Sequence, residues 1–200
     1  MIYENKDQLK KACETIIEAD GDDVRLIDEA SFQSKLIDDL IYTVVFSPDA
    51  AVSDAACFLI RRGAAALGIF SASIQSLYEA MGRKEIGGFT VPAINIRGIT
   101  YDVAQAVFRA AMKGKVGPVI FEIARSEIDY TLQRPREYTC AVLAAAVKAG
   151  WRGPVFLQGD HFQINAKKFA ADADKETQTV KNLIWEGIEA GFYNIDIDTS

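Results

Sequence analysis

The sequence lacks several features that mark whole classes of protein. It has one histidine and three cysteines in 200 residues, and its acidic and basic residues are interleaved, with a formal net charge of -6. Without a basic block there is no electrostatic footprint for nucleic acid or an anionic membrane surface. The first residues show no basic segment followed by an apolar one, and the apolar runs are too short to span a bilayer. We therefore expect no nucleic acid and no membrane as a partner.

The cysteines are too few and too scattered to suggest a cysteine-based site. Cys13, Cys57 and Cys140 are odd in number, lie far apart and fall outside any CxxC spacing. This pattern indicates neither a disulfide framework nor a cysteine zinc site. We expect a cytoplasmic protein.

The first 86 residues have the pattern of helices. Apolar residues recur at helical spacing from Leu9 to Ile17 and again from Phe32 to Val44. Ser47 followed by Pro48 is typical of a helix start. The segment SASIQSLYEAMGR supplies a fourth helix before Gly87-Gly88 interrupts the pattern. We expect an all-helical N-terminal extension over residues 1–86, separate from a second domain over residues 87–200.

The pattern of apolar residues changes after Gly88, where short apolar runs alternate with amphipathic helices. The runs are FTVPAINI (89–96), GPVIFEI (117–123), GPVFLQGD (153–160) and FYNIDID (192–198). Each helix between them ends at a glycine: Gly114, Gly150 and Gly191. Strands that alternate strictly with helices, and that are apolar at nearly every position, predict a parallel α/β sheet buried on both faces.

A parallel sheet can be open or closed into a barrel. No GxGxxG follows the first run, so the dinucleotide-binding fold is disfavoured. We expect a (β/α)8 TIM barrel, of which residues 87–200 form the first four βα units. A complete barrel takes roughly 250 residues. We therefore expect the protein to continue beyond Ser200, or another chain to complete the barrel.

Polar residues gather where these runs end. Asn95 lies near the end of the first run, Asp160 ends the third and His161 follows it, and Asp198 ends the fourth. We expect Asp196, two residues before Asp198, to point away from the mouth that these ends form. In barrels the carboxyl ends of the strands carry the active site. Glu122, in the second run, needs a basic partner such as Arg97 or Arg125, or a place in the polar mouth, because an unpaired buried carboxylate is costly.

Three stretches together resemble one enzyme family. AINIRGITYDVAQAVFRAAMKGKVGPVIFEI, PVFLQGDHFQIN and AGFYNIDIDTS are similar, in this order and spacing, to the first four strands of the class II, metal-dependent ketose-bisphosphate aldolases. The similarity covers residues 88–200, and nothing before Gly87 takes part in it.

This resemblance implies a function for particular residues. His161 would be a ligand of zinc or another divalent cation, and Asp160 the acid/base that handles the proton of the hydroxyl made or consumed in the aldol step. Asn95, Asp198 and Ser200 would lie near a phosphorylated sugar substrate. The chemistry is consistent, because a cation can polarise the ketone and a carboxylate within hydrogen-bond reach can move the proton.

Some residues also have simpler interpretations. A lone histidine is commonly a hydrogen-bonded residue at a strand end, Asp160 could cap the following turn, and Asn95 could equally serve a turn.

The chain also departs from the family. Where the family often has a substrate-binding serine after the second strand, this sequence has Ala124-Arg125-Ser126, so Arg125 could replace it as an anion clamp. The family completes its metal site with two later histidines, whereas this chain has only one. The alternative is therefore a non-catalytic, aldolase-like subunit that acts as a scaffold. In either case we expect a homo-oligomer.

Overall fold

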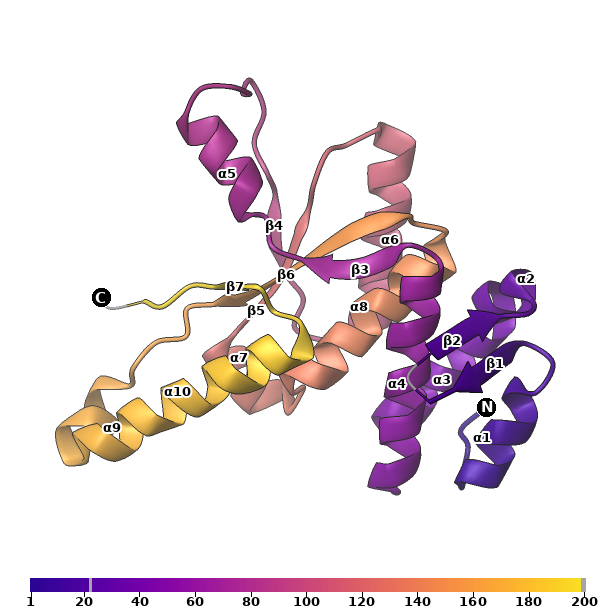
Figure 1. Ribbon diagram of the computed structural model, residues 1–200. Coiled ribbons are helices and arrows are strands. Elements are labelled where there is room, and N and C mark those ends of the chain that lie inside the picture. The colour runs from indigo at the N-terminus through magenta and orange to yellow at the C-terminus, as the bar shows by residue number, and fades with distance from the viewer. Residues whose placement is uncertain (22, 199–200) are drawn as a thin grey trace. The chain divides into compact units, whose positions relative to one another are not determined.

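The computed structural model describes residues 1–21 and 23–198 (Figure 1). The elements of the N-terminal part are α1 (Lys6–Cys13), β1 (Ile17–Asp20), β2 (Asp23–Leu26), α2 (Glu29–Ser31), the π-helical turn η1 (Phe32–Leu36), α3 (Ile37–Phe46), α4 (Ala50–Ala66), β3 (Ile69–Ala72) and α5 (Gln75–Gly82). The elements that follow are β4 (Ala93–Asn95), α6 (Thr100–Gly114), β5 (Ile120–Ala124), α7 (Arg125–Thr131), α8 (Pro135–Ala149), β6 (Gly153–Asp160), α9 (Ala166–Ala171), α10 (Ala173–Ala190) and β7 (Asn194–Ile195). No helix within the described ranges combines the length and the apolar character needed to cross a membrane.

The chain forms two compact units, each made of three separate stretches. The first contains Met1–Phe70, Ile99–Val116 and Cys140–Val155, and the second contains Ser71–Gly98, Gly117–Thr139 and the residues from Phe156 onward. This division does not test the predicted domain boundary near residue 87, which stays a prediction.

The first unit is not all-helical, so the prediction for residues 1–86 is wrong. β1 and β2 form an antiparallel hairpin in which Glu18 lies opposite Arg25, and the two side chains form an ion pair. Gly21 adopts a positive φ of 57° in the turn, a conformation that glycine tolerates without steric cost. The register pairs Asp20 with Asp23, and a two-residue connection that contains glycine is a hairpin signal. Apolar residues continue at helical spacing as far as Ile17, so the pattern predicts a helix where β1 begins.

A disulfide also lies within the first unit, although none was expected. Cys57 on α4 and Cys140 on α8 are joined, with their Cα atoms 6.0 Å apart. The two residues are 83 positions apart in the sequence, so spacing could not reveal the pair. Cys13 remains a free, buried thiol.

The second unit is built around a sheet that is open, so the barrel prediction is also wrong. The five-stranded sheet has the order β3-β6-β5-β4, and β7 pairs with β6 (Figure 1). β4, β5, β6 and β7 run parallel. No closed barrel exists within the described ranges. Alternation of strands and helices predicts a parallel sheet but does not decide whether the edges of the sheet meet. The edge strand β3 falls in residues 1–86, where the sequence pattern predicts only helices.

The two faces of this sheet differ in character. Along β6, Val155, Leu157 and Gly159 are buried, whereas Gln158 and Asp160 are only half-buried. Successive residues of a strand point to opposite faces. One face is therefore apolar and packed, and the other carries polar side chains.

Candidate functional site

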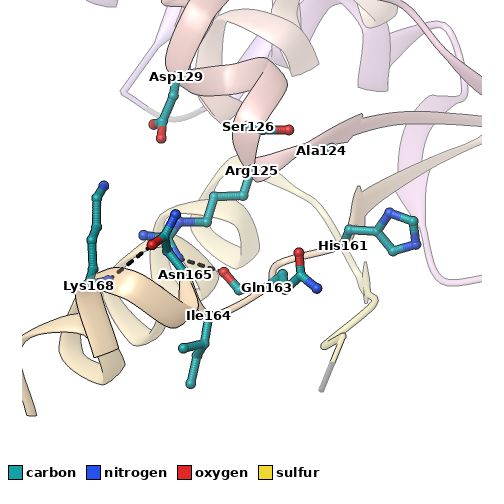
Figure 2. A pocket seen from close by; sticks show the side chains of 9 residues that line it. All are labelled: Ala124, Arg125, Ser126, Asp129, His161, Gln163, Ile164, Asn165 and Lys168. Carbon is teal, nitrogen blue, oxygen red and sulfur yellow. Dashed lines mark hydrogen bonds between the residues drawn. The ribbon is translucent and has the colours of Figure 1, made fainter. Parts of the chain in front are cut away.

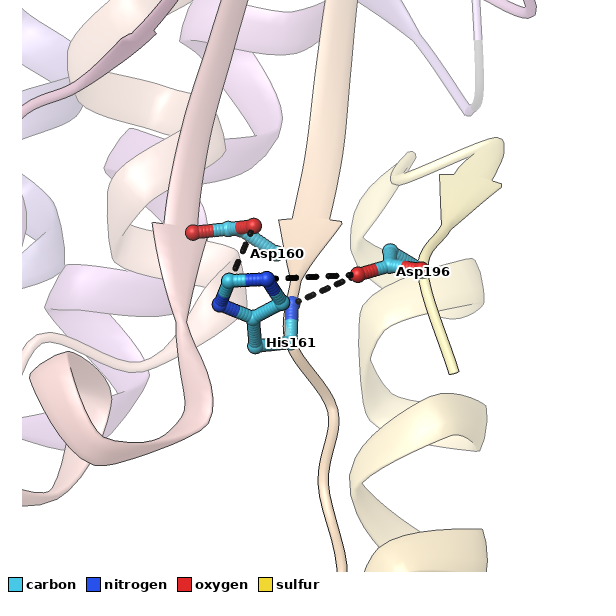
Figure 3. Close-up of side chains that lie close together, drawn as sticks. All are labelled: Asp160, His161 and Asp196. Atoms are coloured by element: carbon cyan, nitrogen blue, oxygen red, sulfur yellow. Dashed lines mark hydrogen bonds and ion pairs between the residues drawn. The ribbon is translucent and has the colours of Figure 1, made fainter. Parts of the chain in front are cut away.

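Three titratable side chains converge at the carboxyl ends of β6 and β7. Asp160, His161 and Asp196 each offer a ligand atom, and these atoms all lie within 4.8 Å of one another (Figure 3). The Nδ1 atom of His161 lies 3.7 Å from Oδ1 of Asp160, and its Nε2 atom lies 3.9 Å from Oδ2 of Asp196. The imidazole is 62% exposed, so a small molecule or ion can reach it.

The backbone around His161 explains why adjacent residues address the same place. His161 has a φ of 44°, in the left-handed region that non-glycine residues seldom adopt. This turn ends β6 and keeps the imidazole beside the Asp160 carboxylate. The next residue, Phe162, is fully buried, and its N–H donates to the Asp196 carbonyl at 2.9 Å.

Asp196 belongs to this cluster, contrary to the expectation that it points away. Its N–H donates to the Gly159 carbonyl at 2.8 Å, and its Oδ2 atom accepts from the His161 N–H at 3.3 Å. These bonds fix Asp196 against the end of β6. The expectation failed because the last strand, β7, is only two residues long, so the chain leaves strand geometry before Asp196.

A row of polar side chains crosses the sheet below the cluster. The register pairs Asn95 with Glu122, Glu122 with Gln158, and Gln158 with Asn194. Residues at one register position of parallel strands share a face. Glu122 therefore lies in the polar row, where its Oε2 atom accepts from Gln158 Nε2 at 2.9 Å. Neither Arg97 nor Arg125 pairs with it: Arg97 pairs with Glu127, and Arg125 with Glu176. Burial, and then the nearby Asp160 carboxylate, raise the pKa of Glu122.

Asn95 links this row to the cluster. Its Nδ2 atom donates to Oδ2 of Asp160 and to Oε2 of Glu127, each at 2.9 Å. Glu127 also accepts from the Ala124 N–H at 2.8 Å and pairs with the Arg97 guanidinium. Burial acts to raise the pKa of Glu127, but these hydrogen bonds outweigh it and hold the pKa below its ordinary value. Glu127 is thus a buried, charged carboxylate one amide away from Asp160.

Arg125 lies in a cavity beside the cluster. The cavity has a volume of about 200 Å³, and its lining includes Arg125, Asp129, His161 and Lys168 (Figure 2). Arg125 is buried, and its Nη1 atom donates to the Gln163 carbonyl and to Glu176, both at 2.6 Å. The guanidinium holds the pKa of Glu176 below its ordinary value. His161 therefore belongs both to the cavity wall and to the cluster, and in Figure 2 its imidazole points away from Arg125.

The remaining predicted residues lie outside the cluster. Asp198 follows the end of β7 by three residues and is half-buried. Ser200 lies outside the described residues. Sequence reasoning placed Asp196 away from the site, although it shares a strand-end run with Asp198. It missed Glu127 and Lys168, which carried no motif.

No family model, curated protein or solved structure matched the chain. The resemblance to class II aldolases therefore depends on the quoted motifs alone.

The chemistry of the donor set decides whether a divalent cation fits the cluster. One imidazole nitrogen and two carboxylate oxygens, all within 4.8 Å of one another, are ligands that Zn²⁺ accepts. The oxygen-rich set suits Mn²⁺ at least as well. Asp160, His161 and Asp196 therefore fit a divalent cation, and the open side of the exposed imidazole leaves room for a further ligand.

Proposed function

We propose that the protein is a divalent-metal-dependent aldolase that reversibly cleaves a phosphorylated ketose into dihydroxyacetone phosphate and an aldehyde. The observation that carries this proposal is the convergence of Asp160, His161 and Asp196 at the ends of adjacent parallel strands. The motifs shared with class II aldolases supply the reaction type. The proposal does not require a closed barrel, because the three residues come from neighbouring strands of the open sheet.

Each residue has a defined part in the proposed reaction. His161 and Asp196 hold the cation, which when bound supplies Lewis-acid polarisation of the ketone carbonyl. In cleavage, Oδ1 of Asp160 accepts the proton of the hydroxyl on the carbon that becomes the aldehyde. The electron pair of the broken carbon–carbon bond passes into the ketone fragment as an enediolate, and solvent protonates that carbon to give dihydroxyacetone phosphate. In condensation the same oxygen of Asp160 returns the proton to the new hydroxyl. Asn95 occupies Oδ2 of Asp160, so Oδ1 is the oxygen that faces the cluster.

The adjoining cavity supports an anionic substrate. Arg125 and Lys168 contribute two cationic side chains to its wall, close to His161. A phosphate group is dianionic near neutral pH, and cationic side chains of this kind bind it through charge-assisted hydrogen bonds. Arg125 would act there through the guanidinium donors other than Nη1, which already binds Glu176.

The experiment that tests the proposal combines activity with metal content. The chain is purified with added Zn²⁺ or Mn²⁺ and assayed for triose phosphate release from fructose 1,6-bisphosphate and tagatose 1,6-bisphosphate. We expect metal-dependent cleavage that EDTA abolishes. Asp160→Asn should lower kcat by about 10²- to 10⁴-fold while retaining metal, and His161→Ala should lose metal.

The matched control is Asp174→Asn, which changes an aspartate in the first turn of α10, outside the cluster. It should leave both activity and metal content unchanged. Cleavage that persists at the wild-type rate in Asp160→Asn, or a chain that binds neither cation and cleaves neither sugar, would refute the proposal.

A second candidate function is a non-catalytic scaffold subunit. Large apolar side chains on α9 and α10 favour it: Phe169, Trp185 and Ile188 are 43%, 66% and 42% exposed. Exposed apolar surface of this kind is typical of protein contacts. A folded oligomer without metal or cleavage activity would support the scaffold, and light scattering measures the proposed homo-oligomer in either case.

The cytoplasmic location also remains a proposal. Disulfides are rare in reducing compartments. Cys57 and Cys140 found reduced in cells would support a cytoplasmic location, and a disulfide found there would contradict it.

A further inference from the structure

We infer that Glu127 is a positioning residue for Asp160, acting through the side-chain amide of Asn95. This inference rests on the proposed function, because it assigns to Glu127 the task of orienting the proposed acid/base. Glu127 carried no motif, and its role follows from three contacts around one amide nitrogen.

The amide of Asn95 stands between two carboxylates. Its Nδ2 atom carries two hydrogens. One is donated to Oε2 of Glu127 and the other to Oδ2 of Asp160, each over 2.9 Å. Because two carboxylates surround this position, the amide must present its NH₂ group there and not its oxygen. Both hydrogens are used, so the amide cannot rotate without breaking a charge-assisted bond.

Glu127 is itself held at both oxygens. Oε2 accepts from the Ala124 N–H at 2.8 Å as well as from Asn95, and Oε1 accepts from Arg97. Its side chain is only 7% exposed, whereas that of Arg97 is 62% exposed. Arg97 thus neutralises the carboxylate from the solvent side, while the backbone of α7 fixes its place. Glu127 is a rigid anchor for the amide.

The consequence for Asp160 concerns which of its oxygens is available. With Oδ2 bound to Asn95, Oδ1 is directed at His161, 3.7 Å from Nδ1. Without the anchor, the Asn95 amide can turn, and the Asp160 carboxylate loses the bond that selects its rotamer. Partners that orient a metal ligand or catalytic group in this way typically contribute 10- to 100-fold in affinity or activity.

Two substitutions separate positioning from simple loss of charge. Glu127→Ala removes the acceptor for Asn95. Glu127→Gln keeps an oxygen at the Oε2 position for Asn95 and Ala124 but loses the ion pair with Arg97. The matched control is Glu186→Ala, which removes an Arg–Glu ion pair of the same unit, with Arg134, away from the site.

We expect kcat for cleavage of fructose 1,6-bisphosphate to fall about 10- to 100-fold in Glu127→Ala, with KM within about threefold of the wild type. Glu127→Gln should recover most of the loss, and Glu186→Ala should match the wild type. The Mn²⁺ dissociation constant, measured by water-proton relaxation, should stay near the wild-type value in Glu127→Ala and in the control, because His161 and Asp196 hold the cation in the proposed function. Wild-type kcat in Glu127→Ala, or equal losses in the Gln and Ala variants, would overturn the inference.

A readout independent of activity distinguishes failure of the proposed function from failure of the positioning role of Glu127. In ¹⁵N-labelled protein, the Asn95 side-chain NH₂ resonances, assigned by their absence in Asn95→Asp, should exchange slowly with solvent. Glu127→Ala should accelerate that exchange, and Glu127→Gln should not. If the wild type neither binds Mn²⁺ nor cleaves the sugar, the proposed function fails. If instead Asn95 exchanges equally fast in the wild type and in Glu127→Ala, the positioning role fails.

Discussion

Replacing Gly159 by alanine should disturb the site from beneath the sheet. A Cβ atom at this position would lie 2.6 Å from Cζ of Phe162 and 2.8 Å from its Cε1. Ordinary contact begins at 3.4 Å, so the ring must withdraw by about 0.8 Å. The ring is fully buried and also lies close to Gly187 on α10, so it has little room to move. Overpacking of this kind typically costs about 1–3 kcal/mol.

The same displacement reaches the metal-ligand cluster. Phe162 follows His161 directly, and its N–H is bonded to the Asp196 carbonyl. Movement of the ring therefore changes the spacing between His161 and Asp196. We expect Gly159→Ala to weaken Mn²⁺ binding as well as to lower the free energy of unfolding.

Urea unfolding and Mn²⁺ titration measure the two effects. The control is Gly117→Ala, in the loop before β5, where an added Cβ would meet nothing within 4 Å and φ is not positive. This control should be as stable as the wild type or slightly more stable, because alanine restricts the unfolded chain. If Gly159→Ala unfolds at the same urea concentration as Gly117→Ala and binds Mn²⁺ equally well, the ring does not support the cluster as described.

Three further predictions concern the cysteines and Glu122. Burial raises the pKa of the Cys13 thiol to about 11, so only about 0.1% is thiolate at pH 8. Ellman's reagent should therefore find no fast thiol in the folded protein, one after unfolding and three after reduction, whereas three before reduction would rule out the disulfide. Loop closure over 83 residues predicts that Cys57→Ala costs about 4–5 kcal/mol of stability. The folded state binds the Glu122 proton more tightly than the unfolded state, because the pKa of Glu122 is raised. As pH falls from neutral through the folded pKa of Glu122, protonation of this group should raise the free energy of unfolding of the wild type. Glu122→Gln should lack this increase. Equal pH slopes in urea unfolding would contradict it.

The sequence predicted the second half of the chain well where local signals decide structure. α6 spans Thr100–Gly114, and α10 ends before Gly191, which adopts a positive φ of 104°. β6 occupies the whole of the predicted run from Gly153 to Asp160. These elements have strong apolar periodicity and clear ends, so tertiary contacts had little to change.

Closure of the sheet and the strands of the first 86 residues could not be predicted in the same way. Each of β1, β2 and β3 has only four residues. Four residues are too few for a period of 2 to be distinguished from a period of 3.6. Whether β3 pairs with β6 depends on long-range contacts that no local pattern encodes. The barrel was an inference from the order of elements, and the edges of the sheet are set by pairing.

The candidate site shows the same division between local and long-range information. Asp160 and His161 were found because one motif contains both. Asp196 and Glu127 come close to them only through the register of β5, β6 and β7 and the turn into α7. Glu122 had two explanations from sequence, a basic partner or a polar surrounding, and the register decides between them by placing Asn95 and Gln158 on its two sides. Burial and the nearby Asp160 carboxylate raise the pKa of Glu122. The Glu122 carboxylate is bonded to the Gln158 amide within the sheet, whereas the carboxylates that lie beside the exposed imidazole of His161 are those of Asp160 and Asp196.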